Sequence, residues 1–132
     1  MLCEYRSDDL ESLHTMKAHF ERIFSAVRKD ATVEVALVGD RPCAGNVDAK
    51  ALSALAALCA DATVQTLGTE APSGGSGSTD ANIPHSLGIP AICVGVYRGA
   101  GTHTREEWVE KSSFVPGLEI AIKLAAKMNE NE

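Results

Sequence analysis

Two short loops carry the residues whose types could do chemistry. The first contains Ser78, Thr79 and Asp80, which follow a run rich in serine and glycine. The second is Gly99–Thr104, in which two glycines and two threonines accompany His103. Hydroxyl and carboxylate groups bind polar substrates, and neutral imidazole is the commonest nitrogen ligand of zinc. The two loops are therefore the first candidates for a binding site.

Each loop also has an ordinary interpretation. A serine- and glycine-rich run is commonly a flexible connection, and a histidine in a loop is commonly a solvated surface residue. A phosphate-binding P-loop is excluded, because it requires lysine directly before its serine or threonine. Here Ser78 stands before Thr79, and there is no lysine between Lys50 and Lys111. The residues of each loop alone leave the choice open.

Helix and strand patterns alternate around these loops. We predict strands at residues 2–5, 32–37, 63–67 and 90–96, and helices at residues 10–27, 47–59, 81–87, 105–110 and 113–128. Ser7 is the expected N-cap of the first helix, and Gly88 should end the third. Thr104 and Glu107 form a possible capping box for the fourth helix.

The last helix should turn an apolar face with Leu118, Ile122 and Ala125 toward the interior. The alternation as a whole predicts an α/β fold with a largely parallel sheet in its second part. A turn-rich segment at residues 39–46 separates a short first part from a longer second one. We therefore expect a domain boundary there, between residues 1–42 and residues 43–132.

Composition narrows the functional classes. The formal net charge is -6 and the twelve basic residues are scattered, which argues against a nucleic-acid partner. No apolar run reaches the roughly 20 residues that span a bilayer, and the N-terminus lacks the pattern of a signal peptide. The four cysteines form no Cys-x-x-Cys pair. This spacing favours reduced, mostly buried thiols in a cytoplasmic protein.

Taken together, the loops and their neighbours point to a known family. The segments Gly77–Pro84, Leu87–Ile92 and Gly101–Val109 closely resemble the C-terminal motifs of zinc-dependent exopeptidases. That family includes peptidase T, carboxypeptidase G, aminoacylase and succinyl-diaminopimelate desuccinylase. Gly39–Pro42 and Glu4–Ser7 resemble the back half of the family's lid domain, so the resemblance covers nearly the whole chain.

The resemblance implies a fold and a chemistry. It implies that residues 43–132 are the C-terminal segment of a metallopeptidase catalytic domain, a mixed, largely parallel sheet with flanking helices. Residues 1–42 would be the second half of an α+β lid and dimerisation domain. In the family, two zinc ions share a bridging Asp and a water that attacks a peptide or N-acyl amide bond, with a Glu as general base. Such sites also accept cobalt or manganese.

Residue by residue, the resemblance implies one metal ligand and a loop beside the active site. His103 matches the last ligand, in the family's small-residue-His-[ST]-x-x-Glu motif. The residues expected to shape the site or to hydrogen-bond there are Ser78, Thr79, Asp80 and Asn82, and Arg41 is a candidate for binding a substrate carboxylate.

The family's other catalytic residues have no counterpart in this sequence. Nothing matches its His-x-Asp motif, its bridging Asp, its Glu-Glu pair or its further carboxylate ligand, and we interpret Glu106 and Glu107 as the start of a helix. His14 and His19 do not share a helix face, and His85 is expected near the cleft without completing a metal site. We therefore assign no catalytic residue and predict that the chain alone neither holds zinc tightly nor hydrolyses peptides.

Two functional classes remain after this comparison. The chain is either part of a longer dizinc metallopeptidase, acting on a peptide or N-acyl amino acid substrate, or a non-catalytic oligomerisation or binding module derived from that family. A half-lid leaves strand edges and a helix face open, and both favour association. A homo-oligomer, dimeric or larger, is therefore expected in either class.

Overall fold

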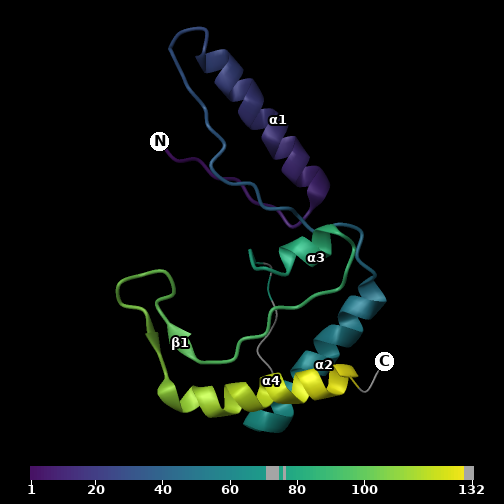
Figure 1. Cartoon of the computed structure of the whole chain (residues 1–132). Coiled ribbons are helices and arrows are strands. Elements are labelled where there is room, and N and C mark those ends of the chain that lie inside the picture. The colour runs from purple at the N-terminus through teal and green to yellow at the C-terminus, as the bar shows by residue number, and fades with distance from the viewer. Residues whose placement is uncertain (71–74, 76, 130–132) are drawn as a thin grey trace. The chain divides into compact units, whose positions relative to one another are not determined.

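The first helix, α1 (Leu10–Val27), carries the apolar stripe that the sequence predicts. The computed structural model describes residues 1–70, 75 and 77–129, and Figure 1 shows the elements in chain order. The N-cap of α1 is Asp9, whose Oδ2 accepts a hydrogen bond from the Ser12 amide at 2.7 Å. Hydrogen bonds from the side chain and then the backbone of Ser12 lower the pKa of the Asp9 carboxyl. Ser7 as N-cap was therefore wrong; its Oγ accepts from the Asp9 amide instead.

Two segments expected as strands accompany α1 without forming a sheet. The ring of Tyr5 lies 4.9 Å from that of Phe20, and Arg28 Nε donates to the carbonyl of Val33 at 3.3 Å. Residues 2–5 and 32–37, all described, are not strands, because neither segment has a hydrogen-bonded ladder partner. None of the 18 residues of α1 is buried in the structure described here.

The second helix, α2 (Ala49–Leu67), is longer than expected. The strand predicted at residues 63–67 is wrong, because that segment continues the helix. No glycine or proline interrupts the sequence between Val47 and Gly68, so helix propagation overrides the β-branched residues. The Thr63 hydroxyl donates to the Cys59 carbonyl at 2.9 Å, and burial raises the pKa of the Cys59 thiol. Gly68, with φ +66°, ends the helix.

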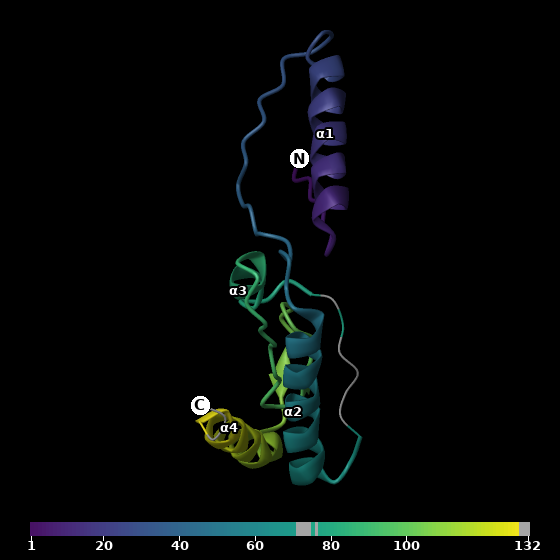
Figure 2. The ribbon, with the colours of Figure 1, turned by 90° about the vertical axis from the view of Figure 1, so that its right-hand side faces the viewer.

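The last helix, α4 (Phe114–Asn129), lies against α2, as both ribbon views show (Figures 1 and 2). Lys123 Nζ donates to Thr66 Oγ1 at 3.0 Å across this contact. Ile120 is buried, and a methyl group on Gly117 would overlap the Val96 carbonyl oxygen. The backbone at Val96 therefore lies against the helix backbone at Gly117, although residues 90–96 do not form the predicted strand.

The apolar face of α4 predicted to point inward is exposed in the structure. Leu118 and Ile122 are 62% and 60% exposed, and Ala125 is also exposed. The residues that α4 buries are Gly117 and Ile120, which lie on another side of the helix. Because α4 is apolar on both sides, the sequence pattern did not show which side meets α2.

A hairpin replaces the helix predicted at residues 105–110. Strands β1 (Gly99–Ala100) and β2 (Trp108–Val109) pair antiparallel, with Gly99 opposite Val109. A short 3-10 helix, η1 (Lys111–Ser113), then leads directly into α4. The helix prediction was wrong, and the Thr104–Glu107 spacing on which it depended belongs to the turn of this hairpin.

The chain divides into two units, and the fold is described within each. The first comprises Met1–Asp48 and Ser76–Ala91, and the second comprises Ala49–Gly75 and Ile92–Glu132. The first unit also contains α3 (Asn82–Ser86), followed by Gly88 with φ +78° as expected. The α/β fold and the boundary after residue 42 stay predictions. Across the described residues, no helix combines the length and apolar character needed to cross a membrane.

Candidate functional site

His103 lies at the turn of the hairpin in an unusual backbone conformation. Its φ is +67°, the only positive value at a residue other than glycine among residues 1–70, 75 and 77–129. Left-handed backbone is costly for a residue with a Cβ, although histidine tolerates it better than most. Such conformations cluster at binding and catalytic sites, where the surrounding contacts hold them.

Hydrogen bonds within the turn hold this conformation. The His103 amide donates to Glu107 Oε2 at 3.2 Å. The Thr104 amide and hydroxyl both donate to the Gly101 carbonyl, at 2.9 and 2.7 Å. The sequence did not predict that the Glu107 carboxylate accepts from the His103 amide, because the spacing of Thr104 and Glu107 was interpreted as a helix start. These contacts fix the backbone and leave the imidazole outside them.

The imidazole of His103 is open to a ligand. The residue is exposed, and within the described chain its ring makes no hydrogen bond or ion pair. Neutral imidazole with an unoccupied ring nitrogen has the chemistry of a zinc ligand. However, among the residues described, no group of three or more His, Cys, Asp or Glu side chains could hold a metal ion. His103 therefore offers one donor.

Two segments far apart in sequence meet in the first unit. Arg41 Nη1 donates to Ser78 Oγ at 3.0 Å, and Asn82 Nδ2 donates to the Pro42 carbonyl at 3.2 Å. The Gly45 amide donates to the His85 carbonyl at 2.9 Å. We call this contact between residues 41–45 and 78–86 the polar clip. Sequence reasoning gave no sign that these segments touch.

Glycine is required at the closest approach within the polar clip. A Cβ on Gly45 would lie 2.8 Å from the Ser86 carbonyl oxygen, closer than real Cβ atoms approach backbone. The turn-rich composition of residues 39–46 therefore reflects a backbone contact as well as a change of direction.

The predicted site residues of the first unit divide into two groups. Asn82 Oδ1 accepts from the Thr79 amide at 2.9 Å, and Thr79 Oγ1 accepts from the Ala81 amide at 3.2 Å, so both side chains build the turn before α3. Arg41, Ser78 and Asp80 are exposed. A guanidinium beside a hydroxyl suits binding of a carboxylate, since arginine presents several donors in a fixed plane.

His85, expected near the cleft, has a structural contact. Its Nε2 lies 2.6 Å from the carbonyl oxygen of Ala91, so this nitrogen carries the proton that it donates. The bond ties the end of α3 to the segment that follows Gly88. This hydrogen bond gives the His85 ring a structural role in holding the turn, which the sequence did not predict.

The cysteines differ in accessibility from the sequence expectation. All four are free thiols, and Cys43 is buried with its Sγ donating to the Ser7 carbonyl at 3.4 Å. Cys3 and Cys93 are exposed, so the expectation of mostly buried thiols was wrong for these two.

The six predicted site residues fall into separate units. Arg41 and the residues of the 78–82 loop belong to the first unit, and His103 belongs to the second. Comparisons with protein-family models, curated proteins and solved structures found no match. The resemblance to zinc exopeptidases therefore depends only on the motif residues in the sequence. The structure shows the contacts that each predicted site residue makes.

Proposed function

We propose that this chain supplies one metal ligand and a substrate-side loop to a dizinc metallopeptidase site. In this proposal His103 is the ligand, and the remaining ligands and the general-base Glu come from polypeptide outside these 132 residues. The substrate would be a peptide or an N-acyl amino acid. The observation that carries the proposal is the exposed ring of His103, presented from a hairpin whose backbone is held in a costly conformation.

A single metal ligand, His103, is consistent with a zinc site whose other ligands come from another stretch of polypeptide, and not with a complete site within this chain. Zinc in proteins takes three or four ligands in a fixed geometry, and most of the binding free energy depends on having them together. A lone imidazole fits one position of that set. When bound, a metal pair supplies Lewis acidity and lowers the pKa of water, so that a nucleophile is available near neutral pH.

The polar clip has a distinct role in this proposal. Arg41 would bind the terminal carboxylate of the substrate, and Ser78, which it contacts at 3.0 Å, would keep its guanidinium oriented. Thr79 and Asn82 would set the shape of the loop, because their polar atoms already bond to its backbone. Asp80 would add a carboxylate that hydrogen-bonds at the edge of the site.

A second candidate function is a non-catalytic oligomerisation or binding module. It is favoured by the exposed side of α4, on which Phe114, Leu118 and Ile122 are each more than half exposed. It is also favoured by α1, an apolar-striped helix without a buried residue in the described chain. Apolar faces of this kind usually meet a partner. The partner would be a second copy of the chain, and the location would be cytoplasmic.

The genomic reading frame distinguishes the two candidates. The metallopeptidase proposal predicts that DNA immediately upstream of Met1 encodes, in the same frame, a His-x-Asp motif and a Glu-Glu pair. A stop codon close upstream, with no other chain supplying those motifs, would contradict that proposal and favour the module. Sequencing of the locus, followed by mass measurement of the natural product, makes this test.

A further inference from the structure

The His103 hairpin has little of its own to fix its direction. Only two residue pairs join β1 and β2, and every residue from Gly99 to Val109 is exposed. A hairpin of this length is marginal by itself in water. Its orientation must therefore come from its base, where residues 98 and 110 leave the ladder.

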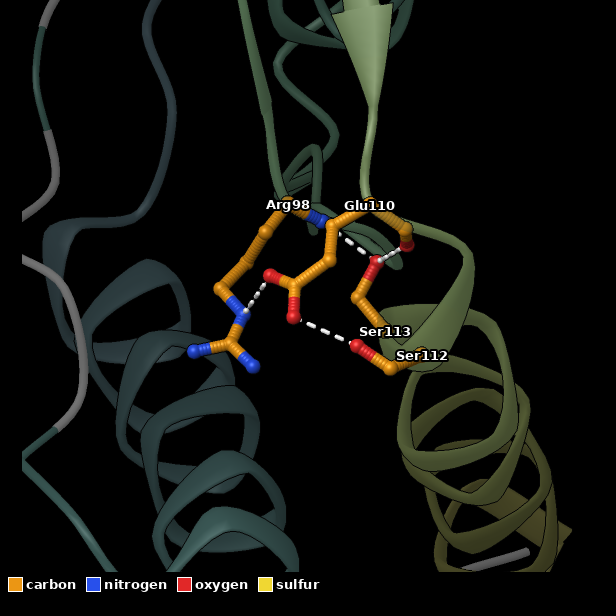
Figure 3. Close-up of polar contacts among 4 residues, drawn as sticks. All are labelled: Arg98, Glu110, Ser112 and Ser113. Atoms are coloured by element: carbon orange, nitrogen blue, oxygen red, sulfur yellow. Dashed lines mark hydrogen bonds and ion pairs between the residues drawn. The ribbon is translucent and has the colours of Figure 1, made fainter.

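A polar network at this base connects the hairpin to α4 (Figure 3). The Glu110 amide donates to the Arg98 carbonyl at 2.8 Å, which closes the hairpin. The Arg98 amide in turn donates to Ser113 Oγ at 2.8 Å, and that hydroxyl donates to the Glu110 carbonyl at 2.6 Å. One side chain thus bonds to both strands of the hairpin base.

Side chains reinforce this connection. Arg98 Nε lies 3.1 Å from Glu110 Oε2, and Glu110 Oε1 accepts from the Ser112 hydroxyl. The ion pair is largely exposed and contributes little alone. Ser113 differs, because it is 4% exposed and immediately precedes α4, so water cannot easily replace its bonds.

We infer that Ser113 and Glu110 are positioning residues, which hold the His103 hairpin in a fixed direction relative to α4. Ser113 bonds both strands at the base, and Glu110 connects Arg98 to η1. Glu107 holds the backbone of the tip, so fixing the base fixes the backbone from which the imidazole projects. The relevance of this hairpin to metal binding rests on the proposed function. The inference that Ser113 and Glu110 fix the direction of the hairpin depends only on the contacts described above.

The test is an NMR measurement on the full chain. Order parameters of the hairpin amides should be about 0.85 in the wild type and fall below about 0.6 in Ser113→Ala, while the α4 amides keep their values. Hydrogen-exchange protection of the Arg98 amide should drop about 10-fold, since its acceptor is lost. A merely structural role in the unit would lower the order of α4 as well.

Matched variants complete the experiment. Glu110→Gln removes only a largely exposed ion pair, so it should loosen the hairpin less than Ser113→Ala does. Glu106→Gln, which removes the same charge within the hairpin, should leave it unchanged. The Ser112 hydroxyl reaches only the Glu110 carboxylate. Ser112→Ala should therefore lower the order parameters of the hairpin less than Ser113→Ala does. An ordered hairpin in Ser113→Ala, or loss of α4 order in both Ser113→Ala and Glu110→Gln, would overturn the inference. If the hairpin loosens in Ser113→Ala but the His103 ring of the wild type does not respond to zinc, the metal-ligand proposal is contradicted and the positioning inference is still supported.

Discussion

Replacing Gly117 by alanine is expected to destabilise the second unit by about 3 kcal/mol, because the new methyl group overlaps a backbone oxygen. The obstacle is the Val96 carbonyl, which cannot rotate away as a flexible side chain could. Alanine is intrinsically better than glycine inside a helix by roughly 0.5–1 kcal/mol, so this preference opposes the clash without offsetting it. Urea denaturation followed by circular dichroism measures the outcome.

Gly95→Ala is the matched control for this prediction. Gly95 lies next to Val96 in the same unit, has no heavy atom within 4 Å of its ideal Cβ position apart from its own and its chain neighbours' atoms, and does not have a positive φ. Its substitution should change the free energy of unfolding by no more than about 0.5 kcal/mol. Equal stability of the Gly117→Ala and Gly95→Ala proteins would mean that Val96 does not lie against α4.

The chain alone is expected to show no zinc-dependent hydrolysis of peptides or N-acyl amino acids. Complete enzymes accelerate such reactions by roughly a million-fold or more, and this acceleration requires metal ligands and a general base held together. Within the described residues no such cluster exists, and His103 is the single predicted ligand. Product formation in the presence of zinc should therefore equal that of zinc in buffer.

Tripeptide, dipeptide and N-acyl amino acid substrates should all be assayed, with the chelated protein and His103→Ala as controls. All three protein samples should give the same background rate. Turnover that a chelator removes and that His103→Ala lacks would contradict the proposal, because it would place a working site within these 132 residues.

The helices were predictable where local signals agreed. The stripe from Leu10 to Val27 gave α1, and the glycine after residue 87 marked the end of the turn that follows α3. The extension of α2 to Leu67 was missed, because Thr63 and Val64 have β-branched side chains. Packing against α4 and the absence of a helix breaker outweighed that local preference.

The hairpin was missed for a different reason. Thr104 and Glu107 have the spacing of a capping box, but here the carboxylate reaches the His103 amide in a tight turn. The glycines at 99 and 101 were the available signal, because they permit the close approach of the strands and a positive φ. Spacing alone does not distinguish a helix start from a turn that uses the same bonds.

The polar clip depended on long-range contacts that no local pattern contains. Arg41 and Ser78 were predicted as separate candidates, and nothing in the sequence indicated that two residues 37 positions apart form a hydrogen bond. Similarly, Ser113 looked like the ordinary start of a helix until its hydroxyl was seen to join Arg98 and Glu110. The sequence shows which residue types are present, but their hydrogen-bond partners could be identified only from the folded structure.

The most direct test of the central claim is the zinc affinity of the chain as given, measured by calorimetry and by the NMR signals of its histidine rings. We predict that the His103 ring responds to zinc with a dissociation constant of about 1 mM or weaker, which is about -4 kcal/mol. Complete structural sites reach roughly 10–16 kcal/mol in size. His103→Ala should remove that response, and His19→Ala, which alters an exposed histidine of α1, should not. Stoichiometric binding at micromolar zinc, or a His103 ring that stays silent while His19 responds, would contradict the account.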